Sequence, residues 1–272
     1  MIEYSMDINS IYEKQNNIES GICMKQKYGK RILISILVVI VVVCGAFAFY
    51  VNDYYEADTS VEDYLSGNDN VSVISTKEGL FLDGKGEEKA LIFYPGAKVE
   101  YTAYLPMLME LAEEGVDCFL VKMPFHLAFF GMNKADTIMK QYDYDQWYLS
   151  GHSLGGAMAA YYASSHLDKL DGLALFGAYP TKELKKEGFL VVSIYGSEDK
   201  VLNMKKVEEG RSYMPTQYFE VCLQGGNHSQ FGNYGEQKGD GIATMSREEQ
   251  QEKSVEAVLK MIQEHSWPLN HY

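Results

Sequence analysis

The sequence WYLSGHSLGG, Trp147–Gly156, contains a G-x-S-x-G pattern centred on Ser153. A strand-like run (QWYLS) leads into it, and a run of small residues typical of a helix packed on a sheet (GGAMAAYYA) follows it. In this context the pattern predicts a sharp strand-to-helix turn that lifts the Ser153 hydroxyl above the edge of a sheet. The amino end of the helix would place N–H groups and partial positive charge where a reaction intermediate carries negative charge. The alternative is a glycine-rich turn in which Ser153 only caps the helix.

A serine nucleophile needs a histidine base, and the histidine needs a carboxylate that orients it. Downstream of Ser153, the run LVVSIY is followed by Glu198 and Asp199, and the run YFEVCL is followed by a loop that contains His228. These residues share with Ser153 the carboxyl edge of a parallel sheet, the edge where such sheets bind ligands. We expect Asp199, which has the shorter side chain, to be the acid and His228 to be the base. The other candidate bases are His166, His265 and His271.

Two backbone N–H groups are expected to bind the oxyanion of the intermediate. One belongs to Leu154, the residue after the nucleophile. The other comes from the loop PGAK after the strand-like run ALIFY, where Gly96 lets the chain approach closely and Ala97 is the candidate donor. An ordinary strand-to-helix turn is the alternative interpretation of this loop.

Strand-like runs alternate with helical patterns through the rest of the chain. Helices are expected at residues 101–114, 153–165 and 246–264, and the last opens with a capping box of Ser246 and Glu249. Such alternation predicts an α/β fold built of βαβ units, with a mostly parallel eight-stranded sheet flanked by helices. The strand-like runs are Val71–Ser75, Leu80–Leu82, Ala90–Tyr94, Asp117–Lys122, Gln146–Ser150, Gly172–Phe176, Phe189–Tyr195 and Gln217–Leu223.

Five segments between residues 71 and 264 resemble the fold-5 α/β-hydrolase family, which is related to dienelactone hydrolases. They are FYPGAKVEYTAYLPML, VKMPFHLAFFG, GHSLGGAMAA, YGSEDKV and GGNHSQFGNYGEQKGDG. The resemblance implies an α/β-hydrolase fold in which Ser153, Asp199 and His228 are the catalytic triad, in the chain order serine, acid, histidine. Dienelactone hydrolases use a cysteine nucleophile, and the serine at position 153 argues against that specific reaction.

The segment MPFHLAFFG is expected to wall the substrate pocket with Phe125, Phe129 and Phe130. Lipases and many esterases insert a lid or cap between two of the later strands. Here only 12 residues separate Phe176 from Phe189, which leaves no room for one. An open pocket favours short or exposed acyl groups, or the surface of a larger polymer.

Residues 32–49 (ILISILVVIVVVCGAFAF) carry no charge, and Ser35 is their only hydroxyl. At about 1.5 Å per residue, a helix of this length nearly crosses a hydrocarbon layer of about 30 Å. Basic residues cluster just before it, at 25–31. The positive-inside rule therefore predicts a single-pass signal anchor with its N-terminus in the cytoplasm and the bulk of the chain outside.

Three alternatives concern the same N-terminal region. The sequence Ala46-Phe47-Ala48 resembles a signal-peptidase site, so the run could be a cleaved signal peptide. Cys44 could be the lipidated residue of a lipoprotein, although the bulky Val43 before it is unusual for such a site. Translation could also start at Met24, which begins the basic sequence MKQKYGKR.

The formal charge of −14 belongs almost wholly to residues 51–272, which carry a net charge of −15. This acidity argues against binding nucleic acid, because phosphate contacts need clustered lysine and arginine. The predicted organisation is a cytoplasmic segment at 1–31, a transmembrane anchor at 32–50, a juxtamembrane stalk at 51–70 and a catalytic domain at 71–272.

These features predict a membrane-anchored serine hydrolase, a carboxylesterase on the outer side of a bacterial cytoplasmic membrane. Its expected partners are a small-molecule or polymer-borne ester and, through the N-terminal helix, the membrane. The sequence has no metal-ligand cluster and no nucleotide-binding glycine loop, so we expect no cofactor and no metal. One alternative is an acyltransferase that uses the same triad. The other is a non-catalytic cell-surface binding protein, against which the complete serine–acid–histidine order speaks.

Overall fold

The computed structural model describes residues 8–263; residues 1–7 and 264–272, and with them His265 and His271, lie outside the described part. The side chains of residues 8–10 and 19–27 are not described either. The chain divides into two units, one that ends at Asn52 and one that begins at Asp53.

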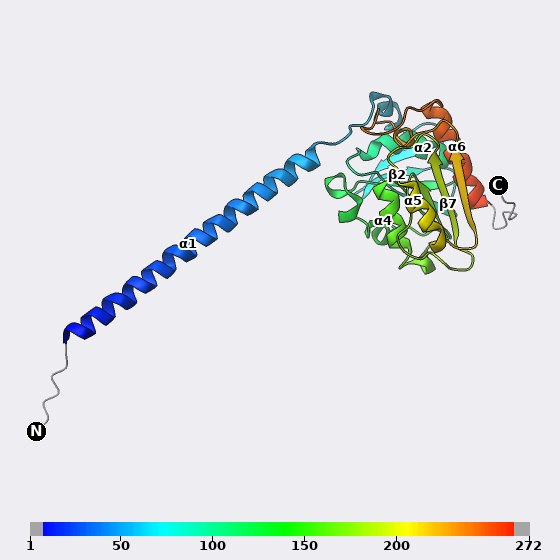
Figure 1. The fold of residues 1–272 in the computed structure, drawn as a ribbon. Coiled ribbons are helices and arrows are strands. Elements are labelled where there is room, and N and C mark those ends of the chain that lie inside the picture. Colours follow the sequence, from blue (N-terminus) through cyan, green and yellow to red (C-terminus); the bar gives the residue numbers. More distant parts are fainter. Residues whose placement is uncertain (1–7, 264–272) are drawn as a thin grey trace, which may run out of the picture. The chain divides into compact units, whose positions relative to one another are not determined.

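The first unit is a single helix, α1 (Ile8–Asn52), drawn in blue in Figure 1. It contains no proline that would break it. Its part from Tyr28 to Asn52 has 25 residues and contains an 18-residue window with a mean hydropathy of 3.2, so it is long and apolar enough to cross a membrane. A signal sequence has the same properties.

The second unit is built on an eight-stranded sheet with the strand order β1-β2-β4-β3-β5-β6-β7-β8. Strands β1 and β2 are antiparallel to their neighbours, and the six strands from β4 to β8 are parallel. The predicted mostly parallel eight-stranded sheet is thus confirmed. The strands are β1 Ser72–Ser75, β2 Gly79–Asp83, β3 Lys89–Tyr94, β4 Asp117–Val121, β5 Gln146–His152, β6 Gly172–Phe176, β7 Leu190–Gly196 and β8 Tyr218–Leu223.

Helices cover both faces of this sheet, because successive strand residues point to opposite sides. In β3, Leu91 and Phe93 belong to the core under α2 and α6, whereas Ala90 and Ile92 belong to the core under α3 and α4. Figure 1 shows α2 and α6 on one side of the sheet and α4 on the other. The helices are α2 Leu105–Glu113, α3 Lys134–Met139, α4 Leu154–Ala163, α5 Met204–Gly210 and α6 Arg247–Gln263.

Residues 53–70, whose acidic composition suggests a stalk, pack against the sheet unit. Tyr55 forms a parallel bridge with Val99, and it is held by a 2.7 Å hydrogen bond from its N–H to the carbonyl of Lys98. A 3-10 helix (Thr59–Tyr64) follows, and its Val61 is only 3% exposed. The residues that follow α1 are thereby joined to the loop that follows β3.

Candidate active site

Ser153 lies at the turn between β5 and α4, in a backbone conformation with φ 53° and ψ −123° that non-glycine residues rarely adopt. It occupies the N-cap position of α4, but its side chain makes no capping hydrogen bond. Close packing forces the turn: a Cβ on Gly155 would lie 2.1 Å from the carbonyl oxygen of Tyr94. The strained backbone and the absence of a capping hydrogen bond at Ser153 are features expected of a nucleophile turn, and the catalytic role of Ser153 stays a prediction.

The side chains of His228, in the loop after β8, and Asp199, in the loop after β7, form a buried hydrogen-bonded pair. The Nδ1 of His228 donates to Oδ2 of Asp199 at 2.7 Å, and the two side chains are 1% and 0% exposed. The other carboxylate oxygen of Asp199 accepts the N–H groups of Val201 and Leu202, at 2.9 and 2.7 Å. These donors fix the carboxylate, which in turn fixes the orientation of the imidazole.

The second nitrogen of His228, Nε2, is buried and has no hydrogen-bond partner among residues 8–263. Because Nδ1 carries the proton given to Asp199, Nε2 presents a lone pair in the neutral ring. Glu198 does not take part in this pair, since its carboxylate accepts from the hydroxyl of Ser197 at 3.2 Å. The structure therefore brings Asp199, and not Glu198, to His228.

The end of β6 lies between Ser153 and this pair. The N–H of Ser153 donates to the carbonyl of Phe176 at 2.9 Å. The next residue, Gly177, has φ 52°, and a Cβ there would lie 2.9 Å from Nδ1 of His228 and 3.2 Å from Oδ2 of Asp199. The loops after β5, β6, β7 and β8 thus meet at the carboxyl edge of the sheet, as the sequence predicts.

The substitution Gly177→Ala is expected to lower kcat/KM for p-nitrophenyl butyrate by about 100-fold, because a displacement of about 1 Å in a catalytic group has effects of this size. The added Cβ would push His228 and Asp199 apart. Gly188→Ala is the matched control: Gly188 also has a positive φ, of 79°, but nothing lies within 4 Å of its added Cβ. Equal activities of the two variants would contradict a catalytic role of the His228–Asp199 pair.

The loop after β3 leaves one N–H group open. The N–H of Gly96 donates to the hydroxyl of Tyr104 at 3.1 Å, and that of Lys98 donates to the carbonyl of His126 at 2.8 Å. For the N–H of Ala97, residues 8–263 provide no acceptor. Leu154 opens α4, and the first N–H groups of a helix have no partner inside it. Both predicted oxyanion donors are therefore available, and their role stays a prediction.

Tyr104 and His152 form a second buried pair that the sequence does not reveal. The Tyr104 hydroxyl lies 2.8 Å from Nδ1 of His152, and the rings of His152 and His228 are 4.4 Å apart. Burial, and after it the neighbouring His228, lowers the pKa of His152 well below its usual range. Burial also raises the pKa of Tyr104. His152 is therefore neutral, and the pair supports the Gly96 loop through an uncharged hydrogen bond.

The lowered pKa of His152 predicts a loss of stability in acid. Above about pH 6.5 the ring is neutral in both the folded and the unfolded chain. As the pH falls below this value, the unfolded chain takes up a proton that the folded chain excludes. The free energy of unfolding then drops by up to about 1.4 kcal/mol per pH unit until the folded pKa is reached. His152→Asn should flatten this dependence in thermal unfolding between pH 7 and 5, and an unchanged slope would contradict the assignment.

The aromatic side chains predicted to wall the pocket lie at the surface. Phe125, Phe129 and Phe130 are 51%, 63% and 49% exposed, and they belong to two short 3-10 turns after β4, Pro124–His126 and Ala128–Phe130. The second turn packs against α4. These side chains are therefore beside the candidate site, and their contact with substrate stays a prediction.

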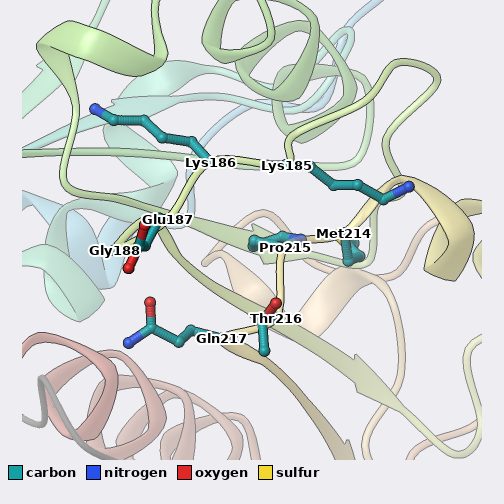
Figure 2. Close-up of a pocket in the computed structure, with 8 residues that line it drawn as sticks. All are labelled: Lys185, Lys186, Glu187, Gly188, Met214, Pro215, Thr216 and Gln217. Atoms are coloured by element: carbon teal, nitrogen blue, oxygen red, sulfur yellow. The ribbon is translucent and has the colours of Figure 1, made fainter.

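A cavity of about 870 Å³ lies at the other end of the sheet (Figure 2). Its walls come from the segments that lead into β7 and β8, whereas Asp199 and His228 follow the carboxyl ends of these strands. It is consequently separate from the candidate site. Its lining residues are Lys185, Lys186, Glu187, Gly188, Met214, Pro215, Thr216 and Gln217. Nowhere in residues 8–263 do three or more His, Cys, Asp or Glu side chains form a group that could hold a metal ion.

Comparison with known proteins agrees with this geometry. A family model described as the alpha/beta hydrolase family matches residues 90–252, a range that contains Ser153, Asp199 and His228. No curated protein matches the chain.

Solved structures with a similar fold include several hydrolases. Est1E from Butyrivibrio proteoclasticus, with ferulic acid bound, is 15% identical, with a TM-score of 0.52 over 72% of this chain and 98% of its own. Dienelactone hydrolase from Anabaena variabilis is 12% identical, with a TM-score of 0.51 over 71% and 99%. A membrane phospholipase A described as a bacterial virulence factor is 13% identical, with a TM-score of 0.53 over 85% and 99%. At these identities the likeness concerns the fold.

Proposed function

Since the chain belongs to the alpha/beta hydrolase family, we propose that it is a serine hydrolase that cleaves carboxylic esters with Ser153, Asp199 and His228. The observation that carries this proposal is the buried His228–Asp199 pair, 2.7 Å apart, whose Nε2 atom is left without a partner among the described residues. A buried histidine with one nitrogen fixed by a carboxylate and the other open is a general base. The strained turn at Ser153 supplies the nucleophile.

In the proposed reaction, Nε2 of His228 takes the proton of the Ser153 hydroxyl while Oγ attacks the carbonyl carbon of the ester. The carbonyl oxygen becomes an oxyanion that the N–H groups of Ala97 and Leu154 stabilise. The imidazolium of His228, stabilised by Asp199, returns the proton to the leaving alcohol. Water then attacks the acyl-enzyme with His228 again as base, and the acid leaves.

The shape of the sheet edge favours short or exposed acyl groups. Between the end of β6 at Phe176 and the start of β7 at Leu190 the chain forms no helix that could serve as a lid. Est1E was solved with ferulic acid, and another similar fold is a phospholipase. These likenesses are consistent with ester substrates and do not select one.

We further propose that α1 anchors the enzyme in a membrane through residues 28–52, with the hydrolase unit outside the cytoplasm. The apolar length of this segment and the lysines and arginine at 25–31 support this orientation. Cleavage after Ala48 is the main competitor. An N-terminal sequence of the mature protein, taken from the membrane and soluble fractions together, that begins at Phe49 would contradict the anchor.

Labelling with a fluorophosphonate probe tests the catalytic assignment. The full chain, solubilised in detergent, should bind one probe, and mass spectrometry of the digested protein should find it on Ser153. The label reports an activated serine, because an unactivated hydroxyl reacts too slowly to be marked. A label on another residue, or no label on folded protein, would refute the proposal. Products formed with and without an added alcohol then distinguish hydrolysis from acyl transfer.

A further inference from the structure

Three phenylalanines form an exposed cluster next to the candidate site. We call residues 124–130 the aromatic loop. The ring of Phe130 lies 5.5 Å from those of Phe125 and Phe129, in edge-to-face contacts, and all three side chains are about half exposed or more. Scattered apolar residues on a surface need no explanation, but a contiguous aromatic group marks an interaction site.

The charge around the aromatic loop differs from that of the rest of the unit. No acidic residue occurs between Lys122 and Lys134, although residues 51–272 carry a net charge of −15. This stretch is therefore apolar with a lysine at each end, of which Lys134 is paired with Glu78 at 2.7 Å. Aromatic and aliphatic side chains flanked by lysine are typical of segments that lie in the interfacial layer of a membrane.

The backbone of the loop is held in a strained shape. Phe125 and His126 have positive φ angles of 57° and 55°, which is costly for two consecutive residues other than glycine. Two contacts hold these residues. The carbonyl of His126 accepts a hydrogen bond from the N–H of Lys98 at 2.8 Å, and the His126 ring stacks on the Tyr54 ring with the ring centres 4.0 Å apart. The aromatic loop is thus tied both to the oxyanion loop and to the segment after α1.

Tyr54 follows Asn52, the last residue of the candidate membrane span, by only two positions. Two extended residues cover at most about 7 Å. The interfacial layer on each side of a bilayer is about 5–7 Å thick. Covalent connection alone therefore keeps Tyr54, and the His126 ring stacked on it, close to the place where the chain leaves the membrane.

We propose that the aromatic loop docks on the bilayer that holds the protein's own helix, and that the substrate is an acyl ester carried by that bilayer. The loop borders Lys98, the residue after the oxyanion donor Ala97, so an ester drawn from the membrane surface meets the site directly. The substrate part of this proposal rests on the proposed serine hydrolase function. The docking part rests on the proposed membrane anchor and not on the hydrolase function.

Lipid quenching of tryptophan fluorescence tests the docking. The full chain is placed in phosphatidylcholine vesicles that contain doxyl-labelled phosphatidylcholine. The fluorescence of the tryptophan in the Phe129→Trp variant should be quenched at least about twofold more than that in the Tyr213→Trp variant. The signal of the parent protein, which comes from Trp147 and Trp267, is subtracted from both. Tyr213 is a matched control because it is 38% exposed and lies next to the cavity at the opposite edge of the sheet. Equal quenching at both positions would overturn the docking proposal.

Hydrolysis of two esters tests the substrate class. One is p-nitrophenyl acetate in solution, and the other is a fluorogenic phosphatidylcholine ester in the same vesicles. The double variant Phe129→Ser, Phe130→Ser should lower the ratio of the vesicle activity to the solution activity by about tenfold or more, because it removes two phenylalanines that docking would bury in the bilayer. An unchanged ratio of vesicle to solution activity in the double variant would overturn the proposal that the substrate is carried by the membrane. Cleavage of only the soluble ester by the parent protein would overturn it as well. Failure to cleave either ester would refute the hydrolase function and leave the quenching result standing.

Discussion

Ser153→Ala is expected to lower kcat for p-nitrophenyl butyrate by about 10⁴- to 10⁶-fold, the range seen when a triad member is removed. The reason is that alanine has no atom to form the acyl-enzyme, while the buried His228–Asp199 pair stays in place. Residual activity would come from the oxyanion donors and from binding alone. Initial rates of p-nitrophenol release by purified full chain give the measurement, and the fluorophosphonate label should disappear in parallel.

A control variant separates this effect from damage to the fold. Ser165 is exposed and follows α4 at its far end, so Ser165→Ala should keep activity within about twofold, as surface substitutions usually do. The thermal unfolding temperatures of both variants should stay near that of the parent. Activity in a folded Ser153→Ala protein above about one hundredth of the parent level would contradict the proposed nucleophile.

Asp199→Asn should lower kcat by about 10⁴-fold, because the amide presents the wrong donor to Nδ1 of His228 and favours the wrong tautomer. The shape of the side chain is unchanged, so the pair stays packed. The two N–H groups of Val201 and Leu202 still find an oxygen.

Glu198→Gln provides the matched comparison at the adjacent position. Its carboxylate contacts Ser197 and does not reach His228, so this variant should stay within about threefold of the parent rate. If Glu198→Gln were the damaging change and Asp199→Asn the mild one, the acid of the triad would have to be reassigned. Equal and small effects would contradict a role for any carboxylate.

Much of the fold can be predicted because apolar runs report strands buried on two faces. All eight strand-like runs are strands in the structure, within a few residues of the expected ends. The largest difference is at β5, which continues through Gly151 to His152 until the elbow at Ser153 ends it. The G-x-S-x-G motif predicts a turn at this point. The hydrogen-bonded pairing with β6 nevertheless continues to His152, beyond the expected strand end at Ser150.

The segment 53–70 shows what composition does not predict. Its acidic and polar residues suggest a solvated stalk, and Val61 and Leu65 are its only large aliphatic residues. The segment is attached through backbone hydrogen bonds, such as those of Tyr55 with Lys98 and Glu100, and through scattered side-chain contacts, such as the stacking of Tyr54 on His126. Backbone pairing of this kind leaves no periodic pattern in a short irregular segment.

The candidate site also has features that the sequence predicts and features that it does not. Ser153, Asp199 and His228 follow recognisable strands, so their common edge could be predicted from the order of elements. The Tyr104–His152 pair could not, because it depends on a contact across 48 residues. The exposure of the aromatic loop could not be predicted either, because the sequence does not show how far phenylalanines beside a pocket extend into solvent.

The attachment of residues 53–58 bears on whether this enzyme can be shed. Proteases that release surface proteins cut flexible, exposed stalks. Here the chain passes from the helix end at Asn52 to a paired backbone at Tyr55, and the N–H of Asp58 already donates to the carbonyl of Asn233. A cut within this segment would sever ties to the loops that carry Ala97 and His228. With the proposed anchor in a membrane, the protein would therefore be suited to work on the cell that makes it rather than as a released, diffusing factor.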